Sequence, residues 1–133
     1  MYGLLDISTS GMIAQRTRLE VATVNIANVD SILDASDENI PFRRRMAILA
    51  PGDARTGGPG VHVASIDIAD GDFRRKFAPG HPKADAEGII FTPDIDIATE
   101  SMNAIEATRA YEANVMAAEA TKSMLSAALR ILA

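Results

Sequence analysis

The residues that could carry out catalysis or bind a metal are few, and their spacing does not form a reaction centre. His62 and His81 are the only histidines, and neither has a ligand partner at suitable spacing on a shared regular element. Asp94 and Asp96 form an i, i+2 pair that could coordinate a cation, but capping the helix that follows is the commoner role. We therefore expect no metal site, no cofactor and no enzymatic activity.

Other catalytic signatures are missing from the sequence. Asp67, Asp70 and Asp72 lack the spaced glutamate of a calcium loop. There is no glycine-rich phosphate loop and no serine elbow. The chain has no cysteine, which rules out disulfides, zinc–thiolate sites and cysteine nucleophiles.

Two short basic runs occur, at residues 43–45 and 74–76. A nucleic-acid surface needs a dense positive footprint, whereas this chain has a net charge of −5 and no aromatic platform beside the runs. We expect these side chains to be solvated or to pair with nearby carboxylates, and we expect no nucleic-acid partner.

The composition is that of a small globular protein. With 133 residues and 47% hydrophobic residues, the chain fits one compact domain, or one core with a small appendage. Asp6 and Arg16 interrupt the apolar residues near the start, where no basic segment stands either, so we expect no cleaved signal peptide. No stretch approaches the length of a membrane span, so we expect no direct membrane insertion.

Helix-breaking residues are concentrated in the middle of the chain. All six prolines fall between Pro41 and Pro93, and seven of the nine glycines lie between Gly52 and Gly88. This distribution predicts a mainly α fold, in which long N- and C-terminal helices pair in a coiled-coil-like manner around a small β-hairpin and turn-rich middle segment. The expected division is an N-terminal helix at 1–29, a middle segment at 30–95 and a C-terminal helix at 96–133.

The N-terminal segment shows heptad-like periodicity and predicts a helix over residues 4–28. Gly11 lies inside this helix, either as a tolerated weak point or as a place where a packed helix comes close. Asn25 and Asn28 stand near its end, where they could cap carbonyls or adopt the left-handed conformation. The residues expected at an interface are Leu5, Met12, Leu19, Ala22, Asn25, Ile26 and Asn28.

The C-terminal segment predicts a helix over residues 97–132 with Asp96 as its N-cap. Two neighbouring apolar seams, rich in alanine, make a face too broad for one partner helix. Because the chain offers only one other long helix, we expect other copies or other proteins to cover the remainder. The residues expected at an interface are Ala107, Tyr111, Asn114, Ala117, Ala120, Met124, Leu125, Ala128 and Ile131.

The middle segment is predicted to form short strands and turns. Residues 46–49 form one strand, and residues 61–68 form another with a bulge, because their alternation slips once. Residues 73–77 and 88–92 are expected to flank a long turn. Residues 30–40 are polar and acidic, and we expect a surface loop.

Several motifs resemble those of bacterial flagellar axial proteins. Residues 6–12 (DISTSGM) and 25–28 (NIAN) are similar to the N-terminal motif shared by rod and hook proteins. Residues 79–82 (PGHP) and 105–115 (IEATRAYEANV) resemble the middle and C-terminal signatures of the FlgC family of proximal rod proteins. The likeness covers nearly the whole chain in the right order.

This resemblance implies a structural subunit of the flagellar basal-body rod, the shaft that crosses the periplasm and transmits torque for motility. It implies assembly through the terminal helices and export by the flagellar type III export apparatus without signal cleavage. The implied partners are other copies of the chain, other proximal and distal rod proteins, the rod-base adaptor and the MS-ring protein. The alternatives are another flagellar axial protein, of the rod or hook, or a helical homo-oligomerising adaptor.

Overall fold

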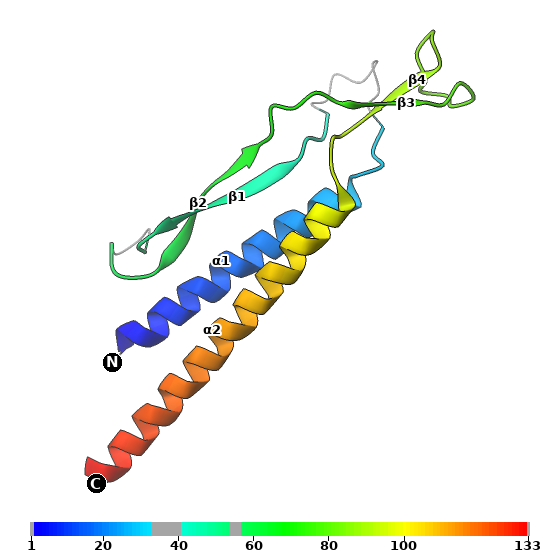
Figure 1. Cartoon of the computed structure of the whole chain (residues 1–133). Coiled ribbons are helices and arrows are strands. Elements are labelled where there is room, and N and C mark those ends of the chain that lie inside the picture. Colours follow the sequence, from blue (N-terminus) through cyan, green and yellow to red (C-terminus); the bar gives the residue numbers. More distant parts are fainter. Residues whose placement is uncertain (1, 33–40, 54–56, 133) are drawn as a thin grey trace.

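Two helices lie side by side, and two small β-hairpins are placed between them in the sequence (Figure 1). A computed structural model describes residues 2–32, 41–53 and 57–132. The elements in chain order are α1 (Tyr2–Ala27), β1 (Arg45–Pro51), β2 (Val61–Ile68), β3 (Arg74–Phe77), β4 (Ile89–Thr92) and α2 (Ile97–Leu132). The two helices were expected at 4–28 and 97–132, so both are confirmed to within about two residues.

The helices are antiparallel and differ in length, with 26 residues in α1 and 36 in α2. The Asn114 side chain of α2 lies against Gly11 of α1, and an amide of Asn25 bonds to Glu100. Continued along both helices, this register places the start of α1 opposite about residue 123 of α2. The C-terminal turns of α2 therefore extend beyond α1, as Figure 1 shows.

Side chains cap the C-terminal end of α1 and the N-terminal end of α2 by hydrogen-bonding to backbone groups. At the end of α1, the side-chain Nδ2 of Asn28 donates to the carbonyl of Val24 at 2.8 Å. Capping by Asn28 is thereby confirmed. The left-handed alternative is wrong, because no described residue other than glycine has a positive φ. At the start of α2, Asp96 is the N-cap, as predicted.

Strands β1 and β2 form an antiparallel ribbon that lies along α1 (Figure 1). Ile48 pairs with Ser65 and Leu49 pairs with Val63, so Ala64 has no partner of its own. This extra residue is the bulge that the slipped alternation predicts. The ribbon is held near both ends of its length, since Ser10 of α1 accepts a hydrogen bond from the backbone N–H of Val61 at 3.1 Å and Asn25 bonds to β1.

Strands β3 and β4 form a second, separate hairpin beyond the helix ends (Figure 1). Its long turn is closed by Asp85, whose carboxylate accepts hydrogen bonds from the backbone N–H groups of Glu87 and Ile89. Gly88 has φ +75, and a Cβ there would lie 2.9 Å from the Cβ of Pro79. Only glycine suits this position, which lets the chain turn back into β4.

Helix makes up only about half of the described residues, so the expectation of a mainly α fold is correct only in part. The middle of the chain holds two two-stranded sheets. Residues 33–40 of the expected acidic loop lie outside the described residues. The division at 1–29, 30–95 and 96–133 stays a prediction. Among the described residues, the buried hydrophobic core consists of Ala14, Ala22, Ile90, Ile95 and Ala107.

Candidate assembly surface and the polar joint that positions it

The contact between the helices is built from small residues. Ala14 and Ala22 of α1 and Ala107 of α2 are at most 2% exposed. A Cβ added to Gly11 would lie 2.6 Å from Oδ1 of Asn114, so the Asn114 side chain of α2 packs directly against Gly11 and fills that space. The close-approach interpretation of Gly11 is therefore the correct one. Alanine and glycine keep the helices near each other while alanine also favours helix formation.

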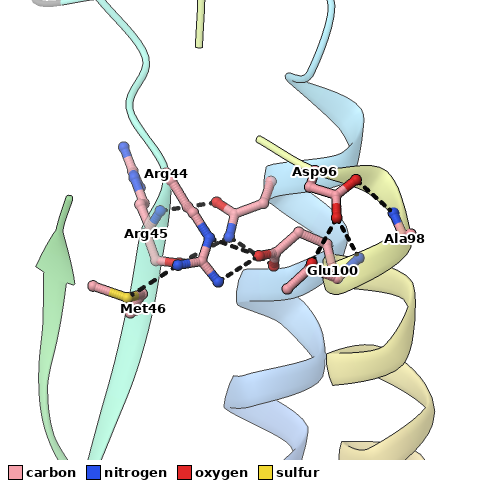
Figure 2. Close-up of polar contacts among 8 residues, drawn as sticks. Arg44, Arg45, Met46, Asp96, Ala98 and Glu100 are labelled. Carbon is pink, nitrogen blue, oxygen red and sulfur yellow. Dashed lines mark hydrogen bonds and ion pairs between the residues drawn. The ribbon is translucent and has the colours of Figure 1, made fainter. Parts of the chain in front are cut away.

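A buried carboxylate lies where both helices meet β1 (Figure 2). Glu100 is 2% exposed; its Oε1 accepts a hydrogen bond from Nε of Arg44 at 2.7 Å and forms an ion pair with Nη2 of the same guanidinium, also at 2.7 Å. Its Oε2 accepts a hydrogen bond from Nδ2 of Asn25 at 3.0 Å. Burying a carboxylate is costly unless it is paired and hydrogen-bonded, and both conditions are met here.

Asn25 extends this cluster to the backbone of β1. Its Nδ2 also donates to the carbonyl of Arg45 at 2.8 Å, and its Oδ1 accepts from the N–H of Arg45 at 3.0 Å. Arg44 belongs to the segment just before β1, and its Nη1 lies 3.2 Å from Sδ of Met46. Asn25, Arg44 and Glu100 are named here the polar joint, since they connect α1, β1 and α2.

The N-cap of α2 lies next to the polar joint (Figure 2). Oδ2 of Asp96 accepts hydrogen bonds from the hydroxyl of Thr99 at 2.6 Å and from its N–H at 3.3 Å, and Oδ1 accepts from the N–H of Ala98 at 3.3 Å. The hydroxyl bond, followed by the backbone bond, holds the pKa of Asp96 below its ordinary value of 3.8. Asp94 instead pairs with Arg74 at 2.8 Å.

The basic runs serve as ion-pair donors and stack on aromatic rings. Arg44 pairs with Glu100 and Arg74 with Asp94, as expected for runs close to carboxylates. The arginines that lie over an aromatic ring are Arg43 on Phe73, Arg45 on Phe42 and Arg75 on Phe91. These contacts stabilise local structure within the chain.

Both histidines contact the backbone. Nδ1 of His62 donates to the carbonyl of Gly52 at 2.7 Å, and Nδ1 of His81 accepts from the N–H of Lys83 at 3.1 Å. Among the described residues, no three histidine, aspartate or glutamate side chains gather in a group suited to a metal ion. Neither described helix combines the length and the apolar composition that crossing a bilayer requires.

One long face of α2 is exposed in the part of the chain that the structure describes. Here the outer stripe means the exposed residues Met102, Ala113, Met116, Ala117, Ala120, Met124, Ala127 and Ile131. Met102 is 71% exposed and Ile131 is 85% exposed. The stripe includes most of one of the two apolar seams that the sequence shows, which consists of Ala110, Ala113, Ala117, Ala120, Met124, Ala127 and Ile131. It runs into the part of α2 that extends beyond α1.

The residues expected at an interface from the sequence fall into three groups. Those that are buried within the chain are Ala22, Asn25 and Ala107. Those that are half-buried are Leu5, Met12, Leu19, Ile26, Asn28, Asn114, Leu125 and Ala128. Those that are exposed are Tyr111, Ala117, Ala120, Met124 and Ile131. The chain thus brings many of the first two groups together between its own helices, while their role between subunits stays a prediction.

Sequence reasoning missed the centre of the polar joint. Arg44 was considered only as part of the basic run at 43–45, and Glu100 was not singled out, although it stands seven residues before Ala107 and so continues the same seam. A glutamate on an otherwise apolar seam is the signal that could have revealed it. The sequence could not show its partners, because Asn25 and Arg44 are 75 and 56 residues away.

Two family models of flagellar rod proteins match the two ends of the chain. Residues 5–31 match the family model described as "Flagella basal body rod protein", and residues 87–131 match "Flagellar basal body rod FlgEFG protein C-terminal". These matches cover most of α1 and of α2 and define the class as flagellar rod proteins.

Full-length relatives narrow the class to one family. The chain is similar to the flagellar basal-body rod protein FlgC of Bacillus subtilis, with 37% identity covering 96% of this chain and 95% of the relative. FlgC of Salmonella typhimurium is 36% identical, with coverage of 94% and 92%. FlgC of Borreliella burgdorferi is 32% identical, with coverage of 99% and 97%.

The chain belongs to the FlgC family of flagellar basal-body rod proteins. It is a structural subunit of the basal-body rod, and these matches indicate no catalytic family.

Proposed function

We propose that this chain is a subunit of the proximal rod and assembles through its terminal helices into the shaft that spans the periplasm and transmits torque. The observation that carries the proposal is the exposure of the outer stripe along α2. An exposed apolar surface of this extent marks an interaction site in a protein that is stable in water.

Burial of the outer stripe supplies the driving force for assembly. Each large apolar side chain contributes about 1.5–3 kcal/mol when it is fully removed from water. Met102, Met116, Met124 and Ile131 are each more than 60% exposed, so the chain alone leaves most of that free energy unused. Close packing of the alanines between these side chains makes an interface of low compressibility, which suits a shaft that transmits torque.

The partners proposed for these surfaces are other copies of the chain and the other proximal and distal rod proteins. The rod-base adaptor, the MS-ring protein and the flagellar type III export apparatus are proposed on the family resemblance alone. In this arrangement, buried residues such as Ala22 and Ala107 hold the two helices of one subunit together. Exposed residues such as Ala120 and Met124 contact neighbouring subunits.

Deletion of the gene, followed by swimming assays and imaging of isolated basal bodies, tests this function. We expect non-motile cells with membrane rings but no completed rod or hook, and we expect this chain to restore both when supplied again. Intact rods and normal swimming in a deletion strain with no second copy of the gene would refute the rod function and favour the homo-oligomerising adaptor.

A further inference from the structure

The seam between α1 and α2 does not by itself determine their register. Gly11 faces Asn114, so Ala14 faces about residue 111 when both helices are followed at 1.5 Å per residue. A shift of seven residues would bring the half-buried Ala118 opposite Ala14, so two small side chains would meet there. Because the apolar pattern repeats every seven residues, the shifted pairing retains the same kind of contact.

The polar joint distinguishes the two registers. In the observed register, the Asn25 amide donates to Glu100 at 3.0 Å in an environment where both residues are nearly inaccessible to water. After the same shift, Asn25 would face Ala107, whose methyl group can neither donate nor accept a hydrogen bond. A buried amide without its partner carries the full cost of desolvation.

Arg44 links this choice of register to the ribbon. Its guanidinium reaches Glu100 from the segment before β1, while Asn25 bonds to the backbone of Arg45. The ribbon can therefore make all of these bonds only when Asn25 and Glu100 stand opposite each other. Buried polar groups that fix the register of paired helices are the best-attested use of such groups.

We propose that Asn25, Arg44 and Glu100 are positioning residues that select one register of the α1–α2 pair and fasten the β1–β2 ribbon to it. The selected register also sets how far α2 extends beyond α1, and hence where the outer stripe is presented. This inference concerns the fold of the single chain, and it stands or falls independently of the proposed function in the rod.

Disulfide trapping in the full-length chain tests the proposal, because the natural sequence has no cysteine. One variant carries Ala14→Cys with Tyr111→Cys, which reports the observed register. The matched variant carries Ala14→Cys with Ala118→Cys, which reports the shifted register. The two α2 positions are about 10 Å apart along the helix, beyond the separation of about 7 Å that a disulfide can bridge. Mild oxidation followed by non-reducing electrophoresis separates intramolecular from intermolecular products.

With the polar joint intact, we expect the first pair to be trapped at least about tenfold more than the second, since breaking a buried pair is strongly unfavourable. In a background with Asn25→Leu and Glu100→Leu, we expect the two yields to become comparable while helicity by circular dichroism is kept. In a Glu100→Gln background, which retains an acceptor for Asn25, we expect the preference for the first pair to persist.

Three results would overturn the proposal. The first is equal trapping of both pairs in the chain with its natural polar joint. The second is an unchanged preference for the first pair in the background with two leucines, which would assign the register to the small-residue seam. The third is loss of helicity in that background, because the joint would then maintain the helices themselves instead of selecting between registers.

Discussion

At the scale of single residues, the molecule combines the smallest side chains with one buried charge. Gly11 and the buried alanines let the helices approach, and they carry little chemical information. Glu100 lies among them with two hydrogen-bond partners supplied by distant parts of the chain. Glu100 contributes a specific hydrogen-bonding geometry. Replacing one member of the polar joint therefore leaves its buried partners unpaired, whereas replacing both Asn25 and Glu100 by leucine removes the buried amide and the carboxylate together.

Removing only the carboxylate should destabilise the chain strongly. Glu100→Ala leaves the amide of Asn25 and the guanidinium of Arg44 without their shared partner, and we expect a loss of about 3–5 kcal/mol in the free energy of unfolding. Glu100→Gln keeps an acceptor and should lose less. Urea unfolding followed by circular dichroism measures both, and equal midpoints for Glu100→Ala and the natural chain would contradict the role of the buried carboxylate.

Filling the contact at Gly11 should also destabilise. In Gly11→Ala, the new methyl group would overlap Oδ1 of Asn114, whose amide donates to the carbonyl of Ala110. We expect a cost of about 1–3 kcal/mol from overpacking. Gly3, which has no atom within 4 Å of an added Cβ, provides the matched control as Gly3→Ala.

A second substitution shows whether Asn114 causes this cost. In a chain that already carries Asn114→Ala, Gly11→Ala should be neutral or stabilising, because alanine favours helix over glycine. Thermal unfolding of the four variants forms a double-mutant cycle. A higher melting temperature for Gly11→Ala alone would show that the helices are not in close contact there.

At the scale of elements, local sequence was sufficient for the positions of the helices and strands. Asp96 and Asn28 act as caps over a single turn, and the bulge at Ala64 follows from the slip between Val63 and Ile66. The polar joint could not be found in this way. The periodicity of apolar residues describes one segment at a time. The burial of Glu100 involves Asn25 and Arg44, which are 75 and 56 residues away in the sequence.

The cap of α2 should make helix stability depend on pH. Hydrogen bonds from Thr99 hold the pKa of Asp96 below 3.8 in the folded chain, so the charged form is stabilised on folding. Its contribution is present above the unfolded value and is lost as the pH falls through the lower, folded-state pKa.

Circular dichroism between about pH 2 and 7 should resolve this dependence when the natural chain is compared with Asp96→Asn. Asparagine caps a helix well without titrating, so helicity in the variant should fall less on acidification below 3.8. Identical acid profiles for the two chains would show that the carboxylate does not contribute through its charge.

At the scale of the whole molecule, the structure divides the apolar surface of α2 between two uses. The residues of α2 that face α1 are buried within the chain, whereas the outer stripe stays exposed along most of the helix. The sequence predicted that α2 has more apolar surface than one helix can cover, because the two seams were visible as separate lines. Only the structure shows that α1 packs on the face of α2 that carries Glu100, Ala107 and Asn114.

The central claim is that the outer stripe is buried between rod subunits, and a matched pair of charge substitutions tests it most directly. Ala120→Asp places a carboxylate on the stripe, and Ser126→Asp places the same group on an exposed position outside it. Cells carrying each variant in place of the natural gene are scored for swimming and for rods in isolated basal bodies. We predict that Ala120→Asp abolishes both at normal protein levels, because a charge is buried without a partner, and that Ser126→Asp preserves both. Complete rods and normal swimming with Ala120→Asp would contradict the account.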